Sequence, residues 1–240
     1  MRAQSMTPYG MALLDYFNGD KEARVTMHRD AGAHYELPVS IFFQEEPQFS
    51  TIEQKALALC RGKILDVGAG TGKHSLVLLK KGFTVDSVDI SPEAVEIMTK
   101  RGIKHARCSN IFDFREGRYD TILMLLHGVG MVETLDGFRR FLNHAENLLN
   151  PKGIILFDTL DVRVTEDPGN LAYQEKNKRQ NRYIGEIHLQ FEYKGEMGSP
   201  HSWLHLDPDT LEDEVSKQGW QKEIIHREPW GDYLVKLLKQ

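Results

Sequence analysis

Three glycines at alternate positions follow a short apolar run that contains one carboxylate. The run covers residues 64–67 and includes Asp66, and the glycines are Gly68, Gly70 and Gly72. A helical pattern of leucines comes next, so the stretch predicts a strand, a tight turn and a helix. Glycine lets a ligand approach the backbone closely, and the free N–H groups of a helix start favour an anionic group. The stretch therefore predicts a binding site for a nucleotide-like cofactor.

The spacing of these glycines favours one class of cofactor over another. The dinucleotide fingerprint G-x-G-x-x-G would need its third glycine at position 73, where the chain has Lys73. The pattern G-x-G-x-G after Asp66 instead resembles the first motif of class I S-adenosylmethionine (SAM) methyltransferases. Asp89 ends the next predicted strand, where a carboxylate can accept hydrogen bonds from both hydroxyls of an adenosine ribose. Asp89 alone does not separate NAD from SAM, and it also suits simple capping of the turn that follows.

Four further segments resemble the later motifs of the same family and occur in the same order. They are VDSVDISPEAVEIM for the second motif, CSNIFDF for the third, YDTILMLLHGVGMV for the fourth and LLNPKGIILFDT for the fifth. The third segment departs from the family pattern, because Asn110 stands where an acidic residue is usual. The resemblance covers residues 50–159 and implies a SAM-dependent methyltransferase.

The resemblance also implies a role for individual residues in holding SAM. Asp66 would hold the methionine amino group, together with a backbone carbonyl of Leu126 or His127. Asp89 would hold the ribose. The other implied contacts are Gly68, Ala69, Gly70 and Gly72 around the methionine, and Ile90, Asn110 and Ile111 around the adenine.

Methyl transfer from a sulfonium needs alignment and exclusion of water, and it needs a base only when the acceptor is protonated. His127 follows the fourth predicted strand, at the sheet edge where open α/β folds bind ligands, so it is the candidate base. An ordinary loop histidine is the alternative. Tyr9, His201 and Trp203 are candidates for the acceptor site or its lid, although alternating residues on a strand also suit packing alone. Arg29 would reach the methionine carboxylate if the N-terminal segment folds over the site, and an exposed Arg29 is the alternative.

The alternation of strands and helices predicts an α/β fold with a doubly wound, mostly parallel, seven-stranded, Rossmann-like sheet. The aromatic-rich segments on either side of the core are expected to meet over the cofactor as a lid, or else each to cover an edge of the sheet. The expected parts are a helical N-terminal cap over 1–49, the SAM-binding core over 50–160, an insertion with an irregular polar stretch (161–181) and an antiparallel hairpin over 161–206, and a final helix with closing strands over 207–240.

Composition narrows the class of protein and of partner. The net charge of −5 disfavours binding to nucleic acid or to an anionic membrane. Two distant cysteines, Cys60 and Cys108, indicate neither a disulfide framework nor a metal site, and they suit a reducing cytoplasm. There is no signal peptide in view and no apolar run long enough for a membrane span.

We therefore expect a cytoplasmic methyltransferase that acts on a small-molecule acceptor and holds no metal. Two alternatives stay open. One is a nicotinamide-dependent oxidoreductase, against which Lys73 counts. The other is a non-catalytic SAM-binding module, because the family has no obligatory catalytic side chain.

Overall fold

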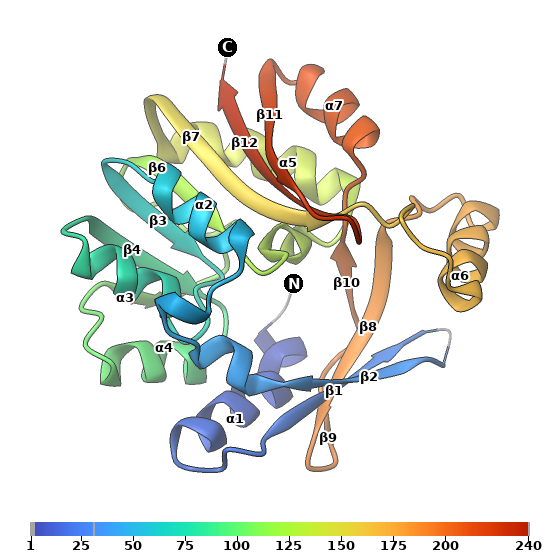
Figure 1. The fold of residues 1–240 in the computed structure, drawn as a ribbon, viewed down its shortest axis with the longest axis horizontal. Coiled ribbons are helices and arrows are strands. Elements are labelled where there is room, and N and C mark those ends of the chain that lie inside the picture. The colour runs from blue at the N-terminus through green and yellow to red at the C-terminus, as the bar shows by residue number, and fades with distance from the viewer. Residues whose placement is uncertain (1–2, 31, 240) are drawn as a thin grey trace.

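A computed structural model describes residues 3–30 and 32–239, and a seven-stranded sheet forms its centre (Figure 1). The strands of this sheet are β3 (Lys63–Val67), β4 (Thr84–Asp89), β5 (Ala106–Cys108), β6 (Tyr119–Met124), β7 (Leu149–Leu160), β11 (Trp220–Arg227) and β12 (Asp232–Lys239). Their order is β11-β12-β7-β6-β3-β4-β5. The strands from β5 to β7 run parallel, and the β11–β12 hairpin adds an antiparallel edge. The predicted doubly wound, mostly parallel sheet is confirmed.

Helices cover both faces of this sheet because its strands are apolar on both sides. Ile122 on β6 packs with the cluster that includes α5 and α7, whereas the next residue, Leu123, packs with α2 and α3. A capping box of Ser50 and Glu53 starts α2, because each side chain binds the other's backbone N–H. The flanking helices are α2 (Thr51–Leu59), α3 (Lys73–Lys80), α4 (Pro92–Lys100), α5 (Leu135–Leu148) and α7 (Pro208–Ser216).

A second sheet joins the N-terminal segment to the inserted one, and Figure 1 shows it facing the central sheet. Its strands are β1 (Arg24–Arg29), β2 (His34–Pro38), β8 (Glu186–Tyr193), β9 (Glu196–Met197) and β10 (His201–Leu204). The order is β10-β8-β1-β2, with β9 paired to β8. Helix α1 (Ala3–Phe17) packs against β8 and α4. We refer to α1 and this sheet together as the cap.

Two expectations about the flanking segments were wrong in detail. The N-terminal part is not purely helical, because β1 and β2 complete a sheet whose other strands are distant in sequence. The stretch expected to be irregular contains α6 (Pro168–Arg179), which begins at an Asp167 N-cap. Its polar sequence has little apolar periodicity, so the helix gave no pattern to detect.

Short 3-10 helices connect these layers in the described part of the chain, and residues of η1 and η3 line the cavity described below. They are η1 (Val39–Phe43), η2 (Glu46–Gln48) and η3 (Gly128–Val132). Within the described part of the chain, no helix is long and apolar enough to cross a bilayer.

Candidate functional site

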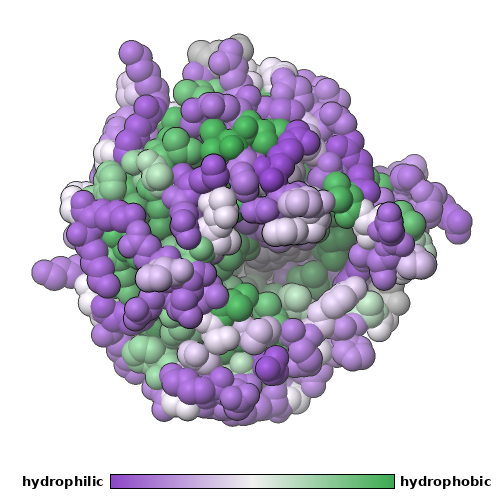
Figure 2. Space-filling view, in the orientation of Figure 1, coloured by the Kyte–Doolittle hydropathy of each residue, from purple (hydrophilic) through white to green (hydrophobic). Residues whose placement is uncertain are grey.

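A cavity of about 530 Å³ lies between the cap and the carboxyl ends of the parallel strands. Figure 2 shows the hollow on the face turned toward the viewer. The central sheet contributes the glycine loop after β3 and the loops after β4 and β6. The cap contributes Tyr9 of α1 and Trp203 of β10, and η1 contributes Phe42. The predicted meeting of the two flanking segments over one pocket is therefore observed in the geometry.

The glycine loop follows β3 in a backbone conformation that suits glycine alone. Gly68, Gly70 and Gly72 have φ values of +69°, +55° and +78°. A Cβ on Gly70 would project into open space, with the Tyr9 hydroxyl as its nearest neighbour at 3.9 Å. A Cβ on Gly72 would instead meet Ile103, so this glycine serves packing and does not line the cavity. Gly70 is therefore the position where the loop leaves room for a ligand.

Two buried carboxylates face the cavity from neighbouring strands. Asp89 accepts hydrogen bonds from the backbone N–H groups of Gly70 (2.8 Å) and Ser91 (2.9 Å). Asp66 accepts one from the Ser75 hydroxyl at 2.6 Å. Burial raises the pKa of both carboxyls, although these hydrogen bonds oppose the rise. Both groups can accept further hydrogen bonds from a ligand that carries O–H or N–H donors.

The loops after β4 and β5 form the wall beside Asp89. Ile90, Asn110 and Ile111 all line the cavity, as expected. The Asn110 side-chain oxygen accepts a hydrogen bond from the Phe112 backbone N–H at 3.0 Å, which fixes the amide within its turn. This wall combines apolar side chains with an oriented amide, an arrangement that suits a flat heterocycle.

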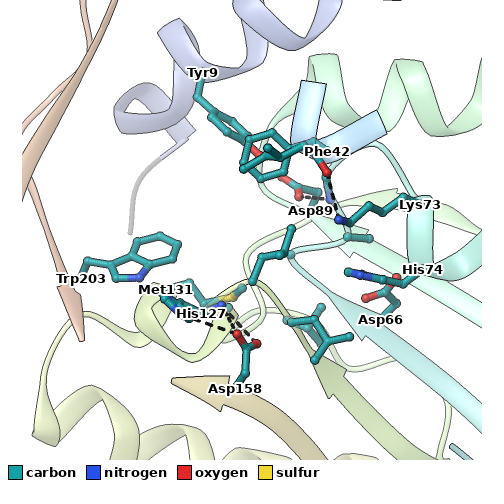
Figure 3. Close-up of a pocket in the computed structure, with 18 of the residues that line it drawn as sticks. Tyr9, Phe42, Asp66, Lys73, His74, Asp89, His127, Met131, Asp158 and Trp203 are labelled. Atoms are coloured by element: carbon teal, nitrogen blue, oxygen red, sulfur yellow. Dashed lines mark hydrogen bonds and ion pairs between the residues drawn. The ribbon is translucent and has the colours of Figure 1, made fainter. Parts of the chain in front are cut away.

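The chain turns sharply after β6, and the turn positions a histidine. Leu126 and His127 both have positive φ, at 58° and 57°, which is strained for residues with a side chain. The His127 backbone N–H donates to the Asp158 carboxylate (Figure 3). Its side-chain Nε2 lies 2.8 Å from Asp232 Oδ1. Both carboxylates therefore hold the turn in place.

The same contacts determine the charge of His127. Burial alone would lower its pKa, but the hydrogen bond to Asp232 and the charges of Asp158 and Asp232 outweigh burial and raise it. Asp232 holds Nε2, and the residue lines the cavity. His127 therefore remains the candidate for proton transfer at this site.

A family model described as "Methyltransferase domain" matches residues 41–223, which is most of the chain. The chain belongs to this methyltransferase family. A SAM-dependent methyltransferase from Bacteroides fragilis, whose crystal structure contains S-adenosyl-L-homocysteine, is similar to it over 100% of this chain and 98% of that one, with 35% identity and a TM-score of 0.86. The resemblance inferred from five sequence motifs is thus confirmed, and the oxidoreductase alternative is not favoured.

Curated relatives match this methyltransferase over shorter stretches. The demethylmenaquinone methyltransferase of Tropheryma whipplei (strain Twist) is 27% identical over 138 residues, which are 55% of this chain and 56% of the relative. The glycine/sarcosine N-methyltransferase of Halorhodospira halochloris is 36% identical over 106 residues, which are 40% and 39%. The chain spans about half the length, or less, of the curated relatives it matches.

Not every residue singled out in the sequence of this methyltransferase reaches the cavity. Tyr9 and Trp203 line it. Arg29 does not, because its guanidinium donates to Asn170 at 2.7 Å and stacks on the Tyr173 ring, so we withdraw it as a carboxylate ligand.

His201 also lies outside the cavity lining. Its ring packs on Phe191 at a centroid distance of 5.3 Å. Trp203, the next residue on the same side of β10, does line the cavity, and so does His205 beyond the end of the strand. Of the three alternating residues, His201 therefore packs inside the cap, whereas Trp203 and His205 line the cavity.

Sequence reasoning missed several polar residues at the His127 end of the cavity. Asp158 had a usable signal, since it lies near the carboxyl end of β7 within the fifth motif. Asp232 had none, because it reaches the site only through the antiparallel pairing of β12 with β7. Glu228 and Trp230, in the turn before β12, likewise depend on that pairing.

Proposed function

We propose that this protein transfers a methyl group from SAM to a small-molecule acceptor by in-line displacement. The observation that carries the proposal is the junction of Gly70 and Asp89. Gly70 has no side chain and leaves open space, and the buried Asp89 carboxylate accepts its backbone N–H at the same cavity. Family membership and the similar Bacteroides fragilis structure with bound S-adenosyl-L-homocysteine support it.

The residues present fit SAM, since a Cβ on Gly70 would fill the space that the cofactor needs. Asp89 would accept hydrogen bonds from the ribose hydroxyls, and Asp66 would hold the amino group together with the Leu126 or His127 carbonyl. Gly68 and Ala69 would line the methionine. The adenine would lie against Ile90, Asn110 and Ile111. When bound, SAM supplies a methyl group on a positively charged sulfur, which is already electrophilic.

The protein's own part is to place the acceptor, exclude water and accept a proton. Tyr9, Phe42 and Trp203 close the cavity from the cap side, and we propose that the cap selects the acceptor. His127 would take the proton that the acceptor loses, and Asp232 would orient its ring. A purely SAM-binding module would show no release of S-adenosyl-L-homocysteine with any acceptor.

Replacing Asp89 by alanine should weaken binding of S-adenosyl-L-homocysteine by roughly 2–4 kcal/mol, or about 30- to 1,000-fold. Two hydrogen bonds to a carboxylate would be lost, and Gly70 and Ser91 would lose their acceptor. Calorimetric titration measures the effect. Asp86→Asn is the matched control, because Asp86 lies on the same strand but binds Tyr119 outside the cavity. Unchanged affinity in folded Asp89→Ala would place the ribose elsewhere.

Gly70→Val should abolish detectable binding while the protein stays folded. The branched side chain would occupy the open space beside the Tyr9 hydroxyl. The positive φ should cost about 1–2 kcal/mol of stability. Gly82→Val is the control, because Gly82 has a φ of +88° and nothing within 4 Å of its Cβ position, but it is outside the cavity. Equal affinity in the two variants would contradict the assigned cofactor position.

A further inference from the structure

One end of the cavity is acidic, and its histidine is already paired with one of the carboxylates. Asp158 and Asp232 contact His127. Glu228, whose backbone N–H donates to the Asp232 carbonyl and whose carboxylate lies 2.9 Å from His226 Nε2, lines the same cavity. Among the described residues of the lining, the only lysine or arginine is Lys73, and its ammonium is paired with Glu53 at 2.7 Å. Figure 3 shows Lys73 across the cavity from His127 and Asp158. The carboxylates at this end outnumber the one imidazole whose pKa they raise, His127, and Asp232 already pairs with it. An acceptor that carried a carboxylate or a phosphate would therefore meet a net negative charge.

Two indole rings accompany these carboxylates. Trp230 lines the cavity although it is 61% exposed, so it lies at the rim, and its indole N–H donates to Asp232 Oδ2 at 2.5 Å. Trp203 lies against η3 at Gly130, where any Cβ would collide with the indole. Aromatic faces beside carboxylates attract cations, because the ring quadrupole adds to the negative charge.

One neutral group at this end lacks a hydrogen bond. The Nδ1 atom of His205 is buried and has no partner among the described residues. Its ring packs edge-on against His127 at a centroid distance of 5.3 Å. Burial and the charge of His127 lower the pKa of His205 to about 3, so the ring is neutral near pH 7. A neutral imidazole nitrogen can accept a hydrogen bond from a donor in the cavity.

We infer that the methyl acceptor is an amine, bound in its protonated form at Asp232, Glu228 and His205 with an apolar body against the cap. The bound ammonium would then lose one proton to unprotonated His127, which frees the nitrogen lone pair to take the methyl group. An ammonium group has only donors, and these residues offer carboxylate and imidazole acceptors. The cap wall is apolar, with Met27 and Leu37 among its members. The inference rests on the proposed function and specifies the substrate class of the same site.

The alternative acceptors match this end of the cavity less well. A carboxylic acid would face three carboxylates, and the His127 imidazole beside them is already paired with Asp232. Its binding would therefore cost free energy through desolvation and repulsion. An alcohol or phenol would use a single donor and would gain nothing from the charge of Asp232 and Glu228. The raised pKa of His127 is consistent with this comparison, since the surrounding groups favour a positive charge there.

The test compares three probes of one shape: 2-phenylethylamine, 2-phenylethanol and phenylacetate. Each is titrated by calorimetry into the protein saturated with S-adenosyl-L-homocysteine, so that no turnover occurs. We expect the amine to bind at least about tenfold more tightly than the alcohol, and phenylacetate to bind most weakly. Glu228→Gln and Asp232→Asn should each reduce the preference for the amine severalfold. Glu223→Gln is the control, because Glu223 pairs with Lys236 on the same hairpin outside the cavity.

Equal affinity for the amine and the alcohol, no binding of the amine, or a preference that survives both variants would overturn the inference. A separate titration with S-adenosyl-L-homocysteine alone reports on the proposed function. If that ligand fails to bind, the proposed function is wrong, and the three probes are then titrated into the protein without it. If it binds and the amine preference is absent, only the substrate class is wrong.

Discussion

Replacing His127 by alanine should lower kcat by roughly 10²- to 10⁴-fold and leave binding of S-adenosyl-L-homocysteine nearly unchanged. Asp232 holds the imidazole through Nε2, and Asp158 accepts the His127 backbone N–H. Alanine removes the proton acceptor proposed here but leaves Asp89 untouched. Initial rates of S-adenosyl-L-homocysteine release, measured with an amine panel, give kcat and KM separately.

If His127→Ala instead disrupted the turn after β6, binding and stability would change together with kcat. His105→Ala is the control, because His105 is exposed and far from the cavity lining. A fall in kcat that came with weaker binding of S-adenosyl-L-homocysteine, or with lost stability, would indicate a collapsed turn. Full kcat in His127→Ala would mean that solvent or another group removes the proton.

The pH profile offers a second readout of the same residue. A base acts in its unprotonated form, so kcat/KM should rise as pH rises through the pKa of His127. Because Asp232 and Asp158 raise that pKa, the midpoint of this rise in kcat/KM should lie above pH 6.5. Asp232→Asn removes one carboxylate and should move the midpoint of the kcat/KM profile to lower pH. A midpoint that does not move would assign the titration to another group.

The parts of the site that sequence predicted are the ones specified by local backbone geometry. The loop from Asp66 to Gly72 and the strand that ends at Asp89 are read from neighbouring residues, because glycine conformation and strand alternation are local properties. The capping box of Ser50 and Glu53 is a local pattern of the same kind. The mostly parallel arrangement of the sheet then followed from the alternation of strands and helices.

The parts that sequence did not predict depend on pairing between distant segments. Strand β1 joins β8 with Met27 opposite Phe191, and nothing near either residue specifies that register. Asp232 reaches His127 because it lies opposite Leu160 in the β12–β7 ladder. Side-chain contacts of this kind decide that Arg29 binds Asn170 and not a cofactor.

A buried charge cluster should make Glu53 one of the most sensitive positions for stability. Its Oε1 lies 2.7 Å from both Lys73 Nζ and His74 Nε2, and its Oε2 accepts the Ser50 backbone N–H at 2.9 Å. These three side chains are only 3–6% exposed. Lys73 also donates a hydrogen bond to the Ile41 carbonyl, which connects α3 to η1, the 3-10 helix that carries Phe42.

We expect Glu53→Ala to lower the free energy of unfolding by roughly 3–5 kcal/mol at pH 7, because it leaves Lys73 buried without a counter-ion. Urea unfolding monitored by circular dichroism measures the change. The double variant Glu53→Leu with Lys73→Met should recover much of the loss, since it removes both charges. Burial would raise the pKa of Glu53, but hydrogen bonds from His74 and Lys73 hold it at about 2, below its ordinary 4.5.

The sign of the pH effect follows from that lowered pKa. Glu53 contributes its full stability above about pH 4.5, and this contribution is lost as pH falls from 4.5 toward 2. Glu53→Ala should therefore differ most from the natural protein near neutral pH and least at pH 2. A Glu93→Ala variant is the control, because the Glu93 carboxylate accepts a hydrogen bond from the Ser91 hydroxyl near a helix start and lies outside the Glu53 cluster. If Glu53→Ala and Glu93→Ala were equally stable, or if the deficit did not shrink in acid, the buried cluster would contribute nothing through its charge.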